Sequence, residues 1–474
     1  MTDDPMTAAV SIPLWLVVLG GLLAAWVLYD RIMMPSVRWL IRSRANKVLN
    51  EVGGRLKIEI RPFQQTRRQA LIDLLAYDAK VQEAVAAHAR AQGMPREVVT
   101  AQVMRYAREI VPVFNAYLYF RVGYWIGRRI AQSLYRVRLG YADSAALAKI
   151  PPNSTVVFVM NHRSNMDYIL AAYLAADQAA LSYAVGEWAR VWPLQQLIRS
   201  MGAYFVRRNS RDELYRRVLE RYIAMATENG VTQGVFPEGG LSRDGKLREP
   251  KLGVFDYMLR GFNPEGERDL VFIPLGINYD RVLEDRTLLL SLDAKAGKPG
   301  VLSAARRTLG FIASQSVLML RSEWKRFGYA CVNFGAPISM RDYCAALGVD
   351  LRKLGKEDRF AHVSELAQYL MSTLGKLIPV LPVPLVATVF CDAPERRFSA
   401  IELKAQVGQR IERLERRGAR IYIPRRELDG AVAAGLEMLT LRHLVVEEDG
   451  LYRANPDEML LLRYYANSIM HLQA

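Results

Sequence analysis

The sequence predicts an α/β domain with a mixed sheet flanked by helices. A helical N-terminal region with one transmembrane helix precedes this domain, and a small, mainly helical C-terminal domain follows it. Three observations support the prediction. An apolar run lies near the N-terminus, short apolar stretches alternate with helical periodicity after Pro151 and Pro152, and the helical pattern returns from Ser339. Alternating strand and helix signals are typical of α/β domains.

Residues 12–29 (IPLWLVVLGGLLAAWVLY) are predicted to cross a membrane. No charged residue occurs between Asp4 and Asp30. At about 1.5 Å per residue, such a helix covers most of a hydrocarbon layer about 30 Å thick. A cleaved signal peptide is the alternative, but its start is normally basic, whereas this N-terminus is acidic.

Basic residues follow the apolar run directly and indicate its orientation: Arg31, Arg38, Arg42, Arg44 and Lys47. Cytoplasmic flanks of membrane helices are enriched in Lys and Arg. Residues 1–11 are therefore expected to form a short extracytoplasmic tail, and the rest of the chain is expected on the cytoplasmic face.

Residues 30–140 are predicted to form a helical, membrane-proximal region. Within it, the stretch from Asn115 to Leu139 interleaves aromatic residues with arginines and is expected to be helical. Such a basic, aromatic helix suits a membrane interface. A packed helix with a solvated basic face explains the same pattern.

Residues 141–345 are predicted to form the α/β domain. The expected strands are TVVFVM, GAYFVR, GVTQGVFPE, LVFIPLGINY and YACVNFG. The expected helices are NMDYILAAYLAA, RDELYRRVLERYIAMATEN and KLGVFDYMLRG. Residues 346–474 are predicted to form the helical C-terminal domain, with one hairpin near Val445 to Arg453.

The composition restricts the class of protein. With 474 residues, 51% of them hydrophobic, the chain is long enough for a large buried core, which argues against disorder. The formal charge of +16 favours polyanionic partners, among them nucleic acid, anionic lipid, coenzyme A and an acidic carrier protein. The three cysteines are widely spaced, so neither a disulfide framework nor a zinc knuckle is expected.

A histidine and an aspartate follow the first predicted strand of the α/β domain. His162 and Asp167 lie five residues apart in NHRSNMDY, at a strand-to-helix turn where α/β sheets expose reactive groups. A neutral imidazole can take a proton from an alcohol, while a carboxylate on its other nitrogen orients it. A capped turn with a hydrogen-bonded histidine is the structural alternative. Because no nucleophilic serine motif occurs, direct attack by an acceptor hydroxyl is favoured over an acyl-enzyme.

Three further segments of the same domain carry candidate binding residues. GAYFVRR ends with Arg207 and Arg208, whose forked guanidinium groups suit a phosphate. FPEGGLSRDG places a glutamate and two glycines at a strand end, where a backbone can approach a ligand closely. IPLGINY (273–279) reads as a buried strand. Taken singly, paired arginines are usually solvated and glycine-rich turns are usually only turns.

These four segments, in this order, resemble the four sequence blocks of the glycerolipid acyltransferases. HRSNMDY is similar to the HRSHMDY block of bacterial glycerol-3-phosphate acyltransferases of the PlsB type. The resemblance implies that His162 is the general base and Asp167 its partner. It also implies that Arg207 and Arg243 contact the acceptor phosphate. The substrate-binding residues expected from the four blocks are Arg207, Arg208, Glu238, Gly239, Gly240, Ser242, Arg243 and Lys251.

The sequence departs from the family pattern at two positions that bear on this site. Asn165 stands where the block has a second histidine, and Leu241 stands where an arginine is expected after Gly240. Arg208 and Lys251 are the candidates to replace that missing phosphate ligand.

The resemblance implies transfer of a fatty acyl group from acyl-CoA or acyl carrier protein to the sn-1 hydroxyl of glycerol 3-phosphate, giving lysophosphatidate. No cofactor or metal is expected. Anionic membrane lipid is an expected partner and nucleic acid is not, and the expected location is the bacterial inner membrane. Lysophosphatidate or dihydroxyacetone phosphate as acceptor is the alternative. The remote alternative is a membrane-tethered nucleic-acid-binding protein. It is suggested by the charge of +16 and by a pattern at residues 398–455 that resembles a winged helix.

Overall fold

The computed structural model describes residues 61–114, 119, 123–175, 181–185, 194–207, 210–290, 327–423 and 427–473. The predicted extracytoplasmic tail and transmembrane helix, together with the chain up to residue 60, lie outside these ranges. None of the described helices has the length and apolar composition needed to span a membrane. Leu56–Ala474 forms one unit by its internal contacts, and the described part of that unit is the subject below.

An eight-stranded mixed sheet organises this unit, in the order β1-β7-β6-β2-β5-β3-β4 with β8 paired to β6. β6 is antiparallel to β7 and to β8, and the other neighbouring strands are parallel. The strands are β1 (Arg136–Ala142), β2 (Thr155–Met160), β3 (Ser182–Val185), β4 (Tyr204–Phe205), β5 (Gln233–Val235), β6 (Leu270–Tyr279), β7 (Tyr329–Phe334) and β8 (Ile338–Ser339). The predicted mixed sheet is thus confirmed.

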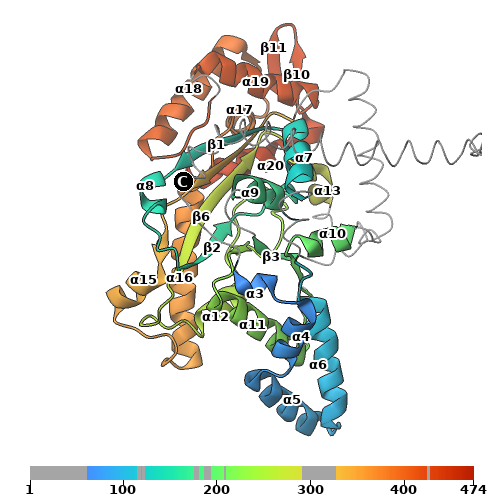
Figure 1. Cartoon of the computed structure of the whole chain (residues 1–474). Helices are drawn as coiled ribbons and strands as arrows, with labels where there is room; N and C mark the ends of the chain where they lie inside the picture. The colour runs from blue at the N-terminus through green and yellow to red at the C-terminus, as the bar shows by residue number, and fades with distance from the viewer. Residues whose placement is uncertain are drawn as a thin grey trace, which may run out of the picture. The chain divides into compact units, whose positions relative to one another are not determined.

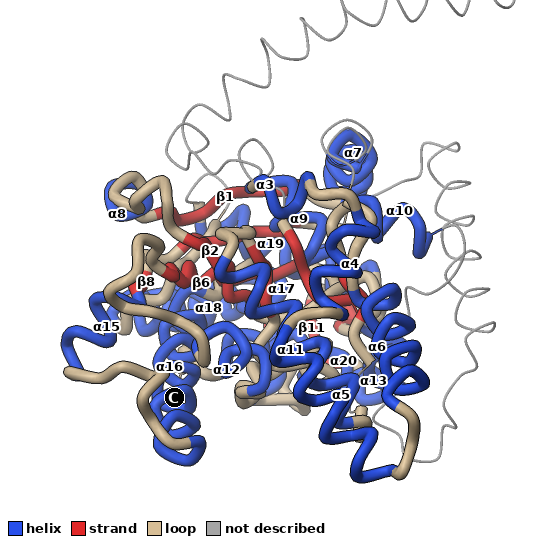
Figure 2. The backbone as a smooth tube through the Cα atoms, turned by 60° about the horizontal axis from the view of Figure 1, so that its bottom comes forward, coloured by secondary structure: helices blue, strands red, loops and turns tan. Residues whose placement is uncertain are grey.

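The central strands have mainly apolar sequences, as expected for strands buried on both faces. Every residue of β2 and β6 is buried, and both strands match their predicted bounds. Successive side chains point to opposite faces: Val156 and Phe158 join one core cluster, and Val157 and Val159 join the other. Helices therefore cover both faces, as Figure 2 shows for the strands in red.

The helices around the sheet begin with an N-terminal group that packs on one side of it. They are α3 (Pro62–Gln65), α4 (Arg68–Ala76), α5 (Ala79–Gln92), α6 (Arg96–Ile110), α7 (Tyr124–Leu134), α8 (Ser144–Leu147), α9 (Met166–Ala175), α10 (Leu194–Ser200), α11 (Glu213–Glu228), α12 (Gly253–Leu259), α13 (Asp285–Leu290), α15 (Met340–Leu347) and α16 (Lys356–Leu377). One core cluster holds residues of α4, α5, α6, α11, α12 and α16, and the other holds residues of α7 and α9.

The helix predicted through Leu139 ends earlier than expected. α7 stops at Leu134, and Arg136–Ala142 is strand β1, which pairs with β7. The helical prediction was therefore wrong for residues 136–139. The physical reason is an alternation that the basic and aromatic composition masked: Arg136 and Arg138 are exposed, while Val137 and Leu139 are partly buried. This is the period of two that a half-buried strand requires.

The C-terminal residues pack onto the sheet and share its core. They form α17 (Pro382–Asp392), α18 (Ala400–Arg416), α19 (Leu428–Leu441), the 3₁₀ helix η7 (Pro456–Glu458) and α20 (Met459–Met470), with a small sheet of β9 (Phe398–Ser399), β10 (Val445–Glu448) and β11 (Leu451–Ala454). The predicted hairpin is confirmed as β10 and β11. Figure 1 shows α18, α19 and this hairpin together, whereas α17 and α20 lie against the large sheet. The core is therefore continuous across the boundary expected at residue 345.

Candidate active site

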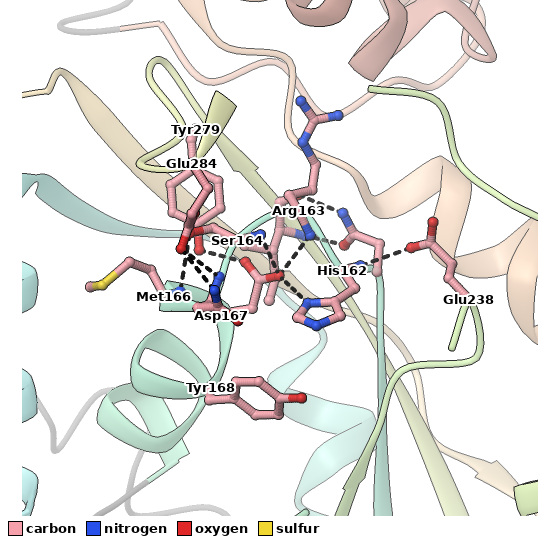
Figure 3. Close-up of polar contacts among 12 residues, drawn as sticks. His162, Arg163, Ser164, Met166, Asp167, Tyr168, Glu238, Tyr279 and Glu284 are labelled. Carbon is pink, nitrogen blue, oxygen red and sulfur yellow. Dashed lines mark hydrogen bonds and ion pairs between the residues drawn. The ribbon is translucent and has the colours of Figure 1, made fainter. Parts of the chain in front are cut away.

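The turn between β2 and α9 brings the histidine and the aspartate together. Nδ1 of His162 lies 3.0 Å from Oδ2 of Asp167, and both side chains are buried. The same carboxylate oxygen accepts the backbone N–H groups of Arg163 at 2.7 Å and Ser164 at 3.0 Å. Because a carboxylate only accepts, this contact places the imidazole proton on Nδ1 and leaves Nε2 with a free lone pair. The imidazole is thus arranged as a base (Figure 3).

A tyrosine from the neighbouring strand holds the other carboxylate oxygen. The hydroxyl of Tyr279, the last residue of β6, donates to Oδ1 of Asp167 at 2.5 Å. Burial, followed by the nearby charge of Asp167, raises the pKa of Tyr279 well above its ordinary value, so the phenol remains a donor. The sequence assigned no role to Tyr279. Its position at the end of the fourth block was the available signal.

Glu238 binds the histidine through the backbone. Its Oε1 accepts the N–H of His162 at 2.8 Å, and its Oε2 accepts the N–H of Arg248 at 3.2 Å. In return, the N–H of Ser242 donates to the carbonyl of His162 at 2.9 Å. Burial raises the pKa of Glu238 to about 7, although both backbone N–H groups oppose this shift. FPEGGLSRDG (residues 236–245), the third of the four family blocks, therefore fixes the peptide units on both sides of His162.

A second carboxylate, which the sequence did not identify, holds the opposite side of the turn. Glu284 accepts the hydroxyl of Ser164 at 2.7 Å and the side-chain amide of Asn165 at 3.1 Å. Asn165, which stands in place of the family histidine, is thus a partner of Glu284. Burial raises the pKa of this glutamate above its usual range.

A cavity of about 350 Å³ opens at His162 and holds five of the predicted site residues in its lining: His162, Arg207, Gly239, Gly240 and Lys251. Aromatic rings flank the imidazole, with Phe236 at 4.1 Å and Tyr168 at 5.5 Å between ring centroids. Much of the remaining lining is apolar, including Val185, Val206, Leu219, Ile223, Val235 and Phe255. The base therefore faces a space that suits an apolar chain.

Arg207 lines this cavity but is already bound to a carboxylate. Its Nε and one terminal nitrogen donate to the two oxygens of Glu109 at 3.0 and 2.6 Å. The guanidinium also lies over the rings of Tyr106 and Tyr215, at 5.1 and 4.9 Å from their centroids. The hydrogen bonds to Glu109 raise the pKa of Arg207 above its ordinary value. Its fork is consequently filled by a residue of α6.

The other predicted binding residues lie elsewhere. Glu238 and Ser242 are buried beneath the loop and do not line the cavity, and Arg243 is exposed outside the lining. Arg208 lies outside the described residues. The structure therefore does not gather Arg207 and Arg243 around one point.

The C-terminal helix supports the loop of the third block. A guanidinium nitrogen of the buried Arg163 donates to the carbonyl of Gly245 at 2.6 Å, and the guanidinium lies over the ring of Tyr464. Asn467 donates to the carbonyl of Asp244 at 2.8 Å. A Cβ on Gly245 would lie 1.9 Å from the backbone oxygen of Tyr464. Only glycine permits this approach of α20 to the loop.

No group of three or more His, Cys, Asp or Glu side chains in the described ranges is arranged to hold a metal ion.

Comparison with known proteins identifies the domains. Residues 144–278 match a family model described as acyltransferase, and residues 315–474 match one described as the glycerol-3-phosphate acyltransferase C-terminal region. The first match contains the turn of His162 and the cavity loops. The second contains α20, which supports them.

Similar proteins were found over most of the chain. A glycerol-3-phosphate acyltransferase of Xylella fastidiosa is 27% identical over 87% of this chain and 48% of its own length. One of Pseudomonas fluorescens is 26% identical over 91% of this chain and 51% of its own length. This chain thus spans about half the length of these relatives.

A solved structure of the 1-acyl-sn-glycerophosphate (LPA) acyltransferase of Thermotoga maritima aligns with 65% of this chain and 97% of that chain, at 17% identity and a TM-score of 0.31. That score supports no residue-by-residue comparison. The assignment depends instead on the two family models and on the similarity across the chain. The chain thus contains an acyltransferase domain at residues 144–278 and, at residues 315–474, a region similar to the C-terminal region of glycerol-3-phosphate acyltransferases.

Proposed function

We propose that this protein transfers a fatty acyl group from acyl-CoA or acyl carrier protein to the sn-1 hydroxyl of glycerol 3-phosphate, giving lysophosphatidate in the first step of phospholipid synthesis. The observation that carries the proposal is the buried pair of His162 and Asp167, 3.0 Å apart, at the edge of a largely apolar cavity with basic residues in its lining. The names of the similar proteins agree with this acceptor.

The proposed reaction is a direct transfer. Nε2 of His162 takes the proton of the acceptor hydroxyl as its oxygen attacks the thioester carbonyl carbon. The tetrahedral intermediate collapses, the carbon–sulfur bond breaks, and the thiolate leaves with the proton from the imidazolium. Asp167 stabilises that imidazolium and holds its tautomer.

The nucleophiles near the cavity favour direct transfer over an acyl-enzyme. Among the described residues of the lining there is no cysteine, and the one serine, Ser210, has no hydrogen bond to His162. A serine needs an adjacent base to become a nucleophile.

The proposed location is the cytoplasmic face of a bacterial inner membrane, with residues 12–29 as a single-pass anchor. The apolar run and the basic residues behind it support this location. α7 offers a second contact with anionic lipid, since Trp125 is 60% exposed and Arg129 is exposed on the same helix. An exposed tryptophan beside arginines suits the headgroup region.

The proposal is tested by incubating the purified chain with radiolabelled glycerol 3-phosphate and palmitoyl-CoA or palmitoyl-acyl carrier protein. Labelled lysophosphatidate is expected from the wild type and not from His162→Ala. Dihydroxyacetone phosphate and lysophosphatidate are offered as acceptors in parallel. A clearly higher kcat/KM with either of them would reject glycerol 3-phosphate as the substrate.

A further inference from the structure

Three cations line the cavity beside His162, and two of them have no acid beside them in the described lining. Arg207, Arg216 and Lys251 contribute to its lining, and the described residues of that lining include no aspartate or glutamate. A concave site with unbalanced cations selects for an anionic group on its ligand. The three cations differ, however, in whether they are free to bind one.

Arg207 is not free. Its two parallel hydrogen bonds to Glu109 use the geometry with which guanidinium groups bind carboxylates and phosphates. Stacking on two tyrosine rings holds it further. The pair with the largely buried Glu109 balances the charge of Arg207 and leaves only the Nη1 side of the guanidinium for another acceptor. Arg207 therefore has a structural role between α6 and the end of β4.

Lys251 is free and is held close to the loop of the third block. Its backbone N–H donates to the carbonyl of Pro237 at 2.8 Å. Its side chain runs past Gly239, where a Cβ would lie 2.6 Å from Cδ and 3.1 Å from Nζ of the lysine. The positive φ of 68° at Gly239 and its missing Cβ make room for this path. The ammonium has no hydrogen-bond or ion-pair partner among the described residues.

Arg216 is the second lining cation without a hydrogen-bond or ion-pair partner among the described residues, and the sequence did not single it out. It lies in the first turn of α11, which is capped by the side chain of Asp212 through the N–H of Tyr215 at 3.0 Å. Its guanidinium is exposed and likewise has no partner in the described part of the chain. The next residue, Arg217, pairs with Glu213 and Glu220 and does not line the cavity.

We propose that Arg216 and Lys251 together bind a phosphate group of a substrate in this cavity. An arginine fork and a mobile ammonium complement the oxygens of a phosphate monoester. Both the acceptor phosphate and the 3′-phosphate of coenzyme A have this chemistry. The inference rests on the proposed function for the identity of the substrates, but the residue assignment can be tested without turnover.

The first experiment measures inorganic phosphate binding by isothermal titration to wild type, Arg216→Gln, Lys251→Gln and the control Arg217→Gln. Loss of a charge-assisted hydrogen bond weakens binding roughly tenfold to hundredfold, so this loss is expected for the first two variants only. Since all three side chains are exposed, each variant should fold, which circular dichroism checks. Binding within twofold of wild type in Arg216→Gln, or an equal loss in Arg217→Gln, overturns the inference.

The second experiment identifies the substrate by the KM values of the same variants. A tenfold rise in the KM for glycerol 3-phosphate alone assigns the acceptor phosphate. A rise for palmitoyl-CoA that disappears with palmitoyl-dephospho-CoA, which lacks the 3′-phosphate, assigns the donor. Unchanged KM values for both substrates contradict the inference. A wild type that acylates no glycerol 3-phosphate contradicts the proposed function instead, and the phosphate titration still decides the role of Arg216.

Discussion

The hydroxyl of Tyr279 donates a 2.5 Å hydrogen bond to the carboxylate of Asp167, which in turn holds Nδ1 of His162. The tyrosine ends β6 and the aspartate lies in the first turn of α9, 112 residues apart in the chain. Tyr279 holds one oxygen of the carboxylate, and the backbone N–H groups of Arg163 and Ser164 hold the other. The carboxylate, fixed in this way, orients the imidazole of His162.

The first prediction concerns this anchor. Tyr279→Phe is expected to lower kcat roughly tenfold with little change in either KM, because one charge-assisted hydrogen bond of about 1.5 kcal/mol no longer positions the carboxylate. Steady-state kinetics on the folded variant measure the effect. The matched control is Tyr135→Phe, since Tyr135 is equally buried but donates to the carbonyl of Arg281. Equal losses of kcat in the two variants would contradict a role for the tyrosine in positioning.

The second prediction concerns the base itself. His162→Ala and Asp167→Ala are each expected to lower turnover by about 10² to 10⁴, since the first removes the proton acceptor and the second its orientation. Asp167→Ala also leaves backbone N–H groups without their acceptor, so its folding is checked by near-ultraviolet circular dichroism. Near-wild-type activity in a folded His162→Ala protein would rule out the mechanism.

The third prediction concerns the close approach of α20 to the loop of the third block. Gly245→Ala is expected to destabilise the protein by at least about 2 kcal/mol more than Gly450→Ala and to reduce kcat. Both glycines have positive φ, 87° and 74°, but a Cβ at Gly450 meets nothing within 4 Å, whereas one at Gly245 meets the backbone of Tyr464. Urea unfolding of the two variants separates backbone strain from the collision. Equal destabilisation would show that the approach is not tight.

The fourth prediction concerns pH. Burial raises the pKa of Glu238 from an ordinary 4.5 to about 7, so the folded state favours the protonated acid. Its contribution to the free energy of unfolding is fully present below pH 4.5 and is lost as the pH rises through 7. At about 1.36 kcal/mol per pH unit, the loss is about 3 kcal/mol.

Glu238→Gln is neutral at every pH and should not show this loss. The free energy of unfolding of wild type relative to the variant is therefore expected to fall by up to about 3 kcal/mol between pH 4.5 and pH 7.5. Urea titrations at pH 4.5, 6 and 7.5 measure the difference. A difference that is independent of pH would mean that the carboxylate ionises as readily as in the unfolded chain.

The fifth prediction concerns the membrane. Deleting residues 1–29 is expected to weaken but not abolish binding to anionic vesicles, because Trp125 and the arginines of α7 remain as a second contact. High salt should release the truncated chain, since exposed charges are screened over about a Debye length. Sedimentation with vesicles measures both effects. A truncated chain that stays in the supernatant at low salt would exclude the second contact.

Local sequence determined the elements whose pattern has one reading. β2 and β6 are short, mainly apolar runs, which are typical of strands buried on both faces, and both were located at their full length. The turn after β2 was equally readable, because Asp167 and His162 lie only five residues apart in the chain and their contact is local. β1 was not, because its alternation of arginine and apolar residues is short and follows directly on the helix α7.

Only the tertiary structure shows which candidate side chains lie together and which of the described cations already have a partner. Arg207 reads as a phosphate ligand in the sequence, yet its fork is bound by Glu109, 98 residues away on α6. Arg216 reads as one of many surface arginines, yet the placement of α11 brings it into the cavity lining. Charge and hydrogen-bonding capacity are properties of a residue, whereas their partners depend on how distant elements pack. The sequence therefore determined which functional groups this site contains, and the fold determined which of them are already paired with other residues.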